Sequence, residues 1–276
     1  MQTVKRGFLP DVCYNRYYME QAEKRILYLD CSAGLSGDMA AGALADLLCD
    51  DTALLDALAF LKPLGYVPEI GSVRNQDVLC RQFHAVAADP GHREKGHIHR
   101  TVSTVRSIIT GGALPREAEA LACRVYDIIA ESEGMAHGVP AEEVHLHEVA
   151  SLSSIADVTA FAYCYTQLGI AYTVIDALYE GTGTVQCAHG ILEVPVPAVS
   201  HILRNCRLPL RRAAASGEIL TPTGAAIAAA VRKTDAVPAG AEILRTGYGA
   251  GTRETGLRGY AAAHLMRLSE GETKHD

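Results

Sequence analysis

The chain has 276 residues and a mass of 29.4 kDa, enough for one large or two small domains with a buried core. Its formal net charge of −7, from 25 Lys and Arg against 32 Asp and Glu, argues against a surface that coats nucleic acid. A hydrophobic content of 49% excludes wholesale disorder, and 6% aromatic residues without Trp supply few stacking platforms for bases or sugars.

The sequence predicts neither a membrane span nor a signal peptide. No apolar run approaches the roughly 18–20 residues of a membrane span. Residues 1–25 lack the apolar core of a signal peptide, so they predict a flexible polar extension and a cytoplasmic protein. None of the eight cysteines forms a CxxC pair, which excludes a zinc ribbon and a thioredoxin motif. We expect inert buried thiols, apart from Cys31 and Cys187, which lie in motifs described below.

Apolar periodicity and Gly or Pro breaks predict a mixed series of strands and helices. Strands are expected at 26–31, 80–88 and 260–268, and helices at 39–48, 51–61, 101–110, 114–134 and 221–233. Helix is expected over most of 140–168, short apolar runs at 171–181, 183–187 and 191–197, and a Gly-rich turn at 247–253. The predicted fold is α/β: a single mixed α/β domain over residues 26–276, with a helix-rich middle and strands toward both ends.

Two His-x-His pairs are the strongest chemical signal. His97 and His99 form the first pair, and His145 and His147 form the second, which Glu148 follows directly. In extended backbone, residues two apart point to the same face, so each pair could bind one metal ion. Imidazole and carboxylate ligands suit Ni, Zn, Cu or Fe without selecting among them. The alternative is that these are loop histidines that titrate in solvent.

A small-residue loop, CSAGLSGD at residues 31–38, joins the first predicted strand to the first helix. Glycines allow close backbone approach, and the free N–H groups of the following helix N-terminus attract anions such as phosphate. The loop is not a P-loop, because it contains no Lys. The candidate phosphate ligands in it are Ser32, Gly34, Ser36 and Gly37. Asp38 could hold a metal ion or act as a base, although ordinary turn chemistry also explains the pattern.

A second helix start follows at Thr221-Pro222-Thr223-Gly224. Thr221 is suited to cap the helix and Pro222 to occupy its first turn, so this is another anion-ready N-terminus or simply a cap.

Two further segments remain open. Cys187 and His189 could form a nucleophile pair or a metal pair, or belong to an ordinary strand–turn–strand. Arg253 ends a Gly-rich turn and could bind a phosphate or carboxylate.

Five motifs in order carry a family resemblance: LDCSAGLSGDM, VHLHEVASLSSIADV, an HG followed by VPVPA, EILTPTGAAI and GYGAGTR. Together they resemble the LarC family, the nickel insertion proteins of nickel-pincer cofactor synthesis. The resemblance runs from about Ile26 to about Leu268.

The resemblance implies an enzyme, a chelatase that inserts Ni(II) into a pyridinium bis-thiocarboxylate mononucleotide and uses CTP with Mn(II) or Mg(II). It implies metal ligands at His97, His99, His145, His147 and Glu148. It implies catalytic roles, in holding a divalent ion or relaying protons, for Asp38, Glu148 and Asp157. It implies binding of the nucleotide phosphate at Ser32, Gly34, Ser36, Gly37, Thr221, Thr223 and Gly224.

This sequence departs from the family pattern in three ways. Ala150 replaces a Gly, and Ser153 replaces an Asp one helical turn before Asp157, which removes a charged oxygen ligand. The His-rich stretch around His97 is shorter than in typical members. Typical members also continue into a C-terminal region, to which we assign CTP binding. This chain is therefore expected either to need a separately encoded C-terminal partner chain or to be a divergent member.

We therefore expect a homo-oligomer that binds a pyridinium mononucleotide and neither nucleic acid nor membrane. A non-enzymatic nickel carrier and a metal-dependent phosphohydrolase using Asp38 are the alternatives.

Overall fold

A mixed seven-stranded sheet forms the centre of the fold. The structure, a computed structural model, describes residues 25–89, 100–147, 149–187, 189–253 and 256–268. The strand order is β2-β3-β10-β11-β1-β4-β9. The strands are β1 (Arg25–Asp30), β2 (Tyr66–Asn75), β3 (Val78–Ala87), β4 (Ile170–Val174), β9 (Arg232–Thr234), β10 (Ala241–Ala250) and β11 (Tyr260–Leu268). β1 pairs antiparallel with β11 and parallel with β4, so the two ends of the described chain meet at the middle of the sheet.

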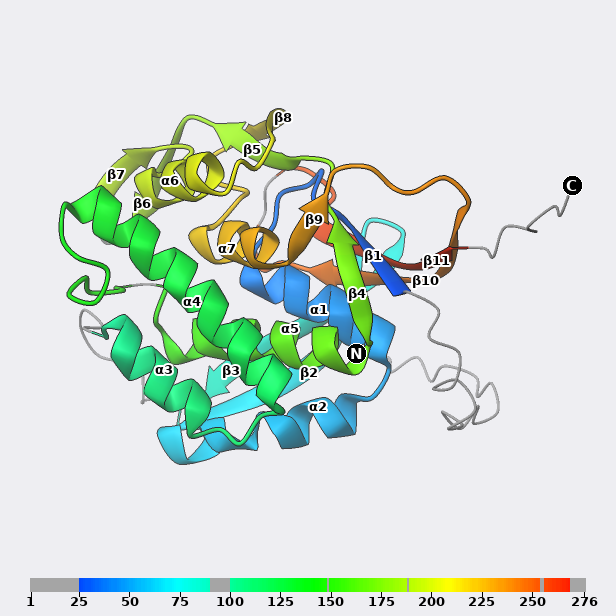
Figure 1. The fold of residues 1–276 in the computed structure, drawn as a ribbon, viewed down its shortest axis with the longest axis horizontal. Coiled ribbons are helices and arrows are strands. Elements are labelled where there is room, and N and C mark those ends of the chain that lie inside the picture. Colours follow the sequence, from blue (N-terminus) through cyan, green and yellow to red (C-terminus); the bar gives the residue numbers. More distant parts are fainter. Residues whose placement is uncertain (1–24, 90–99, 148, 188, 254–255, 269–276) are drawn as a thin grey trace, which may run out of the picture.

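Two small sheets lie at the upper edge of Figure 1. β5 (Leu178–Thr182) pairs parallel with β8 (Leu210–Ser216), and β6 (Thr184–Cys187) forms a hairpin with β7 (Gly190–Glu193). The helices are α1 (Gly37–Leu48), α2 (Asp51–Ala57), the 3₁₀ helix η2 (Ala59–Leu64), α3 (Val102–Thr110), α4 (Arg116–His137), α5 (Leu152–Gln167), α6 (Pro197–Asn205) and α7 (Pro222–Val231).

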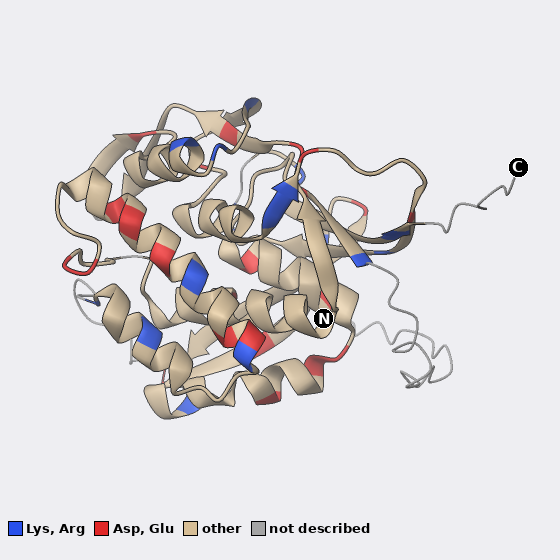
Figure 2. Cartoon of the chain, viewed as in Figure 1, with Lys and Arg blue, Asp and Glu red and all other residues tan. Residues whose placement is uncertain are grey.

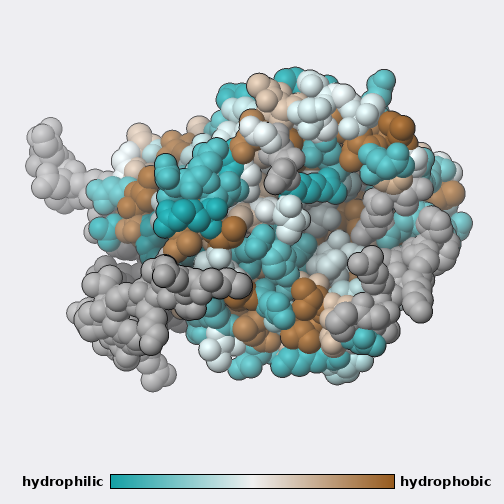
Figure 3. Space-filling model, turned by 180° about the vertical axis from the view of Figure 1, so that it is seen from behind, coloured by the Kyte–Doolittle hydropathy of each residue, from teal (hydrophilic) through white to brown (hydrophobic). Residues whose placement is uncertain are grey.

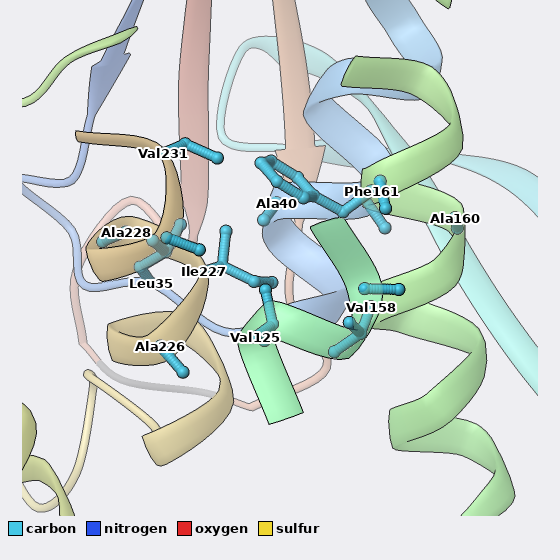
Figure 4. Packing of buried hydrophobic residues seen from close by; sticks show 14 of the residues in the cluster. Leu35, Ala40, Val125, Val158, Ala160, Phe161, Ala226, Ile227, Ala228 and Val231 are labelled. Carbon is cyan, nitrogen blue, oxygen red and sulfur yellow. The ribbon is translucent and has the colours of Figure 1, made fainter. Parts of the chain in front are cut away.

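The core lies where α1, α4, α5 and α7 meet (Figure 4). α5 is covered on both sides, by α1 and by α4, which is why its apolar residues are buried nearly all round. Val125 of α4, Phe161 of α5 and Ile227 of α7 are fully buried there. The Ala-rich sequences of α1 and α7 let the helix backbones approach one another closely, which keeps the helix N-termini near each other.

Glycines bring α1 against the sheet. A Cβ on Gly249 of β10 would lie 2.0 Å from the Met39 carbonyl oxygen, and one on Gly42 would lie 2.8 Å from the Arg81 carbonyl oxygen. Neither position therefore has room for a side chain, and the helix contacts the strands through backbone.

The single mixed α/β fold is confirmed, with the strands near 26–31, 80–88 and 260–268 and the helices near 39–48, 101–110, 114–134 and 221–233. Helix over most of 140–168 is confirmed by α5, although the helix begins only at Leu152 and not near Pro140. Ser151 caps α5 there by accepting a hydrogen bond from Ser154 N at 3.1 Å. The Gly-rich turn at 247–253 is wrong in its first four residues, because β10 runs to Ala250. Its glycines are needed for contact with α1 rather than for bending the chain.

The surface carries both signs of charge. Figure 2 shows Lys and Arg scattered among Asp and Glu, with acidic residues recurring along α4 and no broad basic face on the side shown. From behind, apolar side chains form separate patches among hydrophilic ones (Figure 3). No helix within the described ranges has the length and apolar character to cross a membrane. The expected extension over residues 1–25 falls outside the described part of the chain, apart from Arg25, which begins β1.

Candidate functional site

A pocket of about 620 Å³ opens where four helices begin. Its lining includes residues from the first turn of α1, of α5, of α6 and of α7, and these come from positions more than 180 residues apart in the chain. Helix N-termini carry unpaired N–H groups and a partial positive charge, so four of them around one space favour an anionic ligand. The volume lies in the range of ordinary small-molecule sites.

The loops that lead into α1 and α7 are joined by backbone hydrogen bonds. Leu35 N donates to the Ile219 carbonyl at 3.0 Å, and Thr221 N donates to the Leu35 carbonyl at 3.1 Å. Gly34 has a φ of +86°, and a Cβ on it would lie 2.1 Å from the Ile219 oxygen. A Cβ on Gly224 would likewise lie 2.1 Å from the Leu35 oxygen. The two loops therefore form one unit that sets the spacing between two helix N-termini.

The phosphate candidates divide into two groups. Ser36, Gly37, Thr221 and Thr223 line the pocket, as does Asp38. Ser32, Gly34 and Gly224 do not line it. Ser32 N instead donates to Asp30 Oδ1 at 2.9 Å, and the two glycines allow the loops to touch. Thr221 also caps α7, since its Oγ1 accepts from Gly224 N at 3.1 Å.

Two carboxyl groups lie at the start of α1 and α5. Asp38 Oδ1 accepts hydrogen bonds from Ser36 Oγ and, at 2.9 Å, from Met39 N. Asp157 reaches the pocket one turn after Ser153, beside Gly37. Loss of surrounding water raises the pKa of Asp157 well above its ordinary value, and the neighbouring charge of Asp38 raises it further. The pair thus combines a hydrogen-bonded carboxylate with a carboxyl group that holds its proton more firmly.

A buried carboxylate holds the α7 loop in place. Glu180 on β5 is 0% exposed, and its Oε1 accepts from Gly181 N, Ile219 N and Leu220 N at 2.9, 2.9 and 3.2 Å. Burial raises the pKa of Glu180, and the three backbone N–H groups act in the opposite direction. Glu180 lies outside the pocket lining and acts on it through residues 219–221.

Arg253 contributes the only Lys or Arg side chain among the described residues lining the pocket. Its Nη1 lies 2.5 Å from Glu218 Oε2, and the Glu218 side chain is only 7% exposed whereas that of Arg253 is 60% exposed. Glu218 can therefore hold the guanidinium at the pocket mouth, where it is available to an incoming anion.

The second His-x-His pair adopts neither of the geometries considered for it. Residues 144–147 form neither strand nor helix, and His147 N donates to the His145 carbonyl at 3.1 Å. His147 is half-buried and lines the pocket, whereas His145 is exposed and does not line it. The ring centres of the two histidines are 6.4 Å apart. His97, His99 and Glu148 lie outside the described residues.

Two further histidines lie beside His147. His137 is the last residue of α4, and His189 lies in the turn between β6 and β7, a region that Figure 1 shows at the upper left. The ring centre of His189 is 4.9 Å from that of His137 and 5.0 Å from that of His147, and the other two are 6.3 Å apart. Among the described residues, no three His, Cys, Asp or Glu side chains already have donor atoms around one point. His189 was considered with Cys187, but His137 has no motif around it and was missed.

The two cysteines in the motifs differ in their surroundings. Cys31 is fully buried outside the pocket, and burial raises the pKa of its thiol, as expected for an inert side chain. Cys187 lines the pocket, and its Sγ donates a hydrogen bond to the Gly190 carbonyl oxygen at 3.4 Å.

Three histidines and the first turns of four helices line this pocket. Such a lining is typical of an α/β protein that binds a metal ion and an anionic small molecule. The family model described as nickel insertion protein matches residues 27–275, and the chain belongs to this family. The resemblance read from the five motifs is thereby confirmed.

Curated relatives agree with this assignment. A pyridinium-3,5-bisthiocarboxylic acid mononucleotide nickel insertion protein from Alkaliphilus metalliredigens is 39% identical over 252 residues, which cover 87% of this chain and 60% of that protein. Proteins of the same name from Geobacillus kaustophilus and Akkermansia muciniphila are 34% and 33% identical, covering 83% and 91% of this chain and 56% and 61% of theirs. The chain thus spans about 60% of the length of these relatives. No solved structure matches it significantly.

Proposed function

We propose that this chain inserts Ni(II) into a pyridinium-3,5-bisthiocarboxylic acid mononucleotide, and that the insertion takes place in the pocket at the four helix N-termini. Family membership supports the proposal, together with the names of relatives that are 33–39% identical. The observation that carries it is the pocket itself, in which anion-binding helix starts face histidines.

The phosphate end of the substrate fits the base of the pocket. Backbone N–H groups at Gly37 and Thr223, with the hydroxyl group of Thr223, can receive a phosphate. Arg253 adds the positive charge at the mouth, where it can bind a phosphate or thiocarboxylate group. This arrangement leaves the pyridinium ring directed toward the histidine side of the pocket.

Transfer of nickel from protein to substrate follows from ligand softness. Imidazole nitrogen is a borderline ligand and sulfur is a softer one, so the two sulfur groups of a bis-thiocarboxylate can draw the ion away from histidine. His147, which lines the pocket, is the histidine of the second His-x-His pair that can present the ion to the substrate. Nickel is here a substrate of the reaction.

The two aspartates can manage the protons. Metal binding requires deprotonated ligands and therefore releases protons. Asp38 can act as the acceptor, and Asp157, whose pKa is raised by burial and by the charge of Asp38, can hold a proton. We propose no role for Glu148 beyond its expected one, because it lies outside the described residues.

The resemblance also implies CTP with Mn(II) or Mg(II), and the residues at this site fit a hard divalent ion poorly. Such ions prefer several charged oxygen ligands. Here Ser153 offers a neutral hydroxyl group, and the pKa of Asp157 is raised, which favours its uncharged form. We therefore derive no step through CTP or Mn(II) and assign them to a C-terminal partner region.

The direct test is formation of the nickel-bound mononucleotide, measured by mass spectrometry after incubation of the chain with Ni(II) and the mononucleotide. Reactions with and without CTP, Mn(II) and a C-terminal region supplied separately show which parts are needed. We expect product in at least one condition and a loss of about 100-fold in Asp38→Asn. Nickel binding without product in every condition would favour a carrier, and phosphate release without nickel would favour a phosphohydrolase.

A further inference from the structure

We propose that His137, His147 and His189 together bind the nickel ion at the rim of the pocket before it is transferred to substrate. The identity of the metal rests on the proposed function, whereas the site itself rests on the arrangement of these three side chains. The proposal differs from the sequence interpretation, which pairs His147 with His145.

Three separate elements bring the rings together. His137 ends α4, His147 lies in the loop before α5, and His189 lies in the β6–β7 turn. Their ring centres are 4.9, 5.0 and 6.3 Å apart, with His189 nearest to both others. Imidazoles that bind one metal ion through nitrogen, at about 2.0–2.1 Å, have ring centres roughly 4.5–6.5 Å apart. All three spacings suit a shared ion. The 6.4 Å between His145 and His147 also falls in this range, but only His189 lies about 5 Å from two other histidines.

To bind one metal ion, the three imidazole rings must rotate, but the backbone does not need to move. In the structure the nitrogens do not yet surround one point. Each imidazole rotates about two side-chain torsions, the second of which is broad and weakly restricted. His137 and His189 are exposed, so packing does not resist that rotation. An ion can thus collect the three nitrogens without moving α4 or the hairpin.

A carboxylate lies next to His137, one of the three histidines. Glu133 lies one helical turn before His137, and its Oε2 is 3.6 Å from His137 Nε2. Metal-binding histidines commonly donate their second ring N–H to a carboxylate, which orients the ring and raises its basicity. In the structure the Nε2 of His137 is the nitrogen nearer Glu133, which leaves Nδ1 for the metal in this proposal. Cys187, two residues before His189, offers a softer donor at the same wall.

The position of the cluster suits delivery. All three histidines line the pocket, and two of them are exposed, so an ion can arrive from solvent and leave inward. Three neutral nitrogens bind Ni(II) firmly, yet remain weaker competitors than two sulfur groups on the substrate.

Calorimetric titration with Ni(II), without any nucleotide, tests the site. The background variant carries His97→Ala and His99→Ala, so that the first His-x-His pair contributes no signal. Added to it one at a time are His137→Ala, His189→Ala, His145→Ala and, as a matched control on α6 outside the pocket, His201→Ala. Circular dichroism and melting confirm that each variant is folded.

We expect His137→Ala and His189→Ala each to weaken Ni(II) binding at least tenfold, about 1.4 kcal/mol. His145→Ala and His201→Ala should stay within about twofold of the background. If the His137 and His189 variants bind like the background, or if loss is confined to the His145 variant, the three-histidine site is overturned. X-ray absorption of the nickel-loaded background protein should show about three imidazole ligands.

The insertion assay separates this inference from the proposed function. Product formed by variants that bind Ni(II) as well as the background would remove the three-histidine site and leave the function standing. Loss of Ni(II) affinity in these variants, with no product from the unmodified chain in any condition, would leave the site and remove the function.

Discussion

Asp157 shows how strongly its surroundings act on a single side chain. It lies near the start of α5, with its side chain against Gly37 and near the charge of Asp38. Burial and like charge both favour its protonated form, so the pKa of Asp157 is raised. Folding therefore tolerates a neutral Asp157 better than a charged one.

Replacement of Asp157 by Asn should change how stability depends on pH. A carboxyl group whose pKa is higher in the folded state stabilises the fold below its unfolded pKa, near 3.8, and loses that contribution as pH rises through the folded value. Asp157→Asn removes this loss. We expect the free energy of unfolding of Asp157→Asn minus that of the unmodified chain to increase from about pH 5 to about pH 8 in urea denaturation. A constant difference across that range would contradict the raised pKa.

Glu180 should be a large contributor to stability. Glu180→Ala leaves the N–H groups of Gly181, Ile219 and Leu220 without their acceptor, and each buried unsatisfied donor costs about 1–3 kcal/mol. We expect a loss of about 3 kcal/mol or more in denaturant unfolding. Glu180→Gln keeps an acceptor oxygen and should lose clearly less. Equal losses in the two variants would show that the hydrogen bonds are not the cause.

The residues of the site were only partly predictable from the sequence. Asp38, His147 and Thr221 lie in recognisable motifs, and all three line the pocket. His137 stands alone in its segment, and only the packing of α4 beside the β6–β7 hairpin brings it to His189. Contacts between distant segments leave no local pattern, so a sequence interpretation that depends on spacing cannot find them.

At the level of elements, the shared loop unit before α1 and α7 controls the pocket. Leu35, Ile219 and Thr221 exchange backbone hydrogen bonds, and Glu180 holds the second loop from behind. Any change that shifts α1 or α7 therefore changes the spacing of their N-termini, and with it the anion-binding base of the pocket.

Removing the cap of α7 should destabilise the fold moderately. Thr221→Ala loses the hydrogen bond to Gly224 N, at a cost of about 1 kcal/mol, and frees an N–H group in the first turn. Thr221→Ser keeps the hydroxyl group and should retain most of the stability. Urea unfolding of both variants measures the difference, and a Ser variant as unstable as the Ala variant would argue against capping.

The contact of α1 with β10 should be intolerant of a methyl group. Gly249→Ala places a Cβ 2.0 Å from the Met39 carbonyl oxygen, so α1 must move away from the sheet. We expect a loss of about 3 kcal/mol, within the range for overpacking and backbone shifts, together with weaker binding of the mononucleotide. Gly71→Ala on β2 is the matched control, because the nearest atom to its Cβ is 4.0 Å away. Comparable losses in both variants would mean that strand propensity rather than the contact is responsible.

The contact between α1 and β10 explains why the sequence predicts a turn where a strand lies. Glycines 247, 249 and 251 are typical of a turn, but the first two lie in β10 under α1, where a side chain would clash. The late start of α5 has a similar cause. Residues 141–151 are helical in propensity, and tertiary contacts such as Leu146 N to the Arg100 carbonyl, at 2.8 Å, divert the chain from a helix.

For the whole molecule, composition and periodicity indicate a mixed α/β fold, but not the order of its strands. β11 pairs with β1 across more than 200 residues, β10 pairs with β11, and β3 pairs in parallel with β10 through a short bridge. Those crossovers bring the loops after β1 and β8 to one edge, where the pocket forms. The chain spans about 60% of the length of its curated relatives.

Anomalous diffraction at the nickel edge, from crystals soaked in Ni(II), tests most directly whether nickel binds in the pocket. We predict a dominant peak at the pocket rim, within about 2.1 Å of nitrogens from His137, His147 and His189. Dominant nickel at His145 or elsewhere on the surface, with none in the pocket, would contradict the role of these residues and of the pocket together.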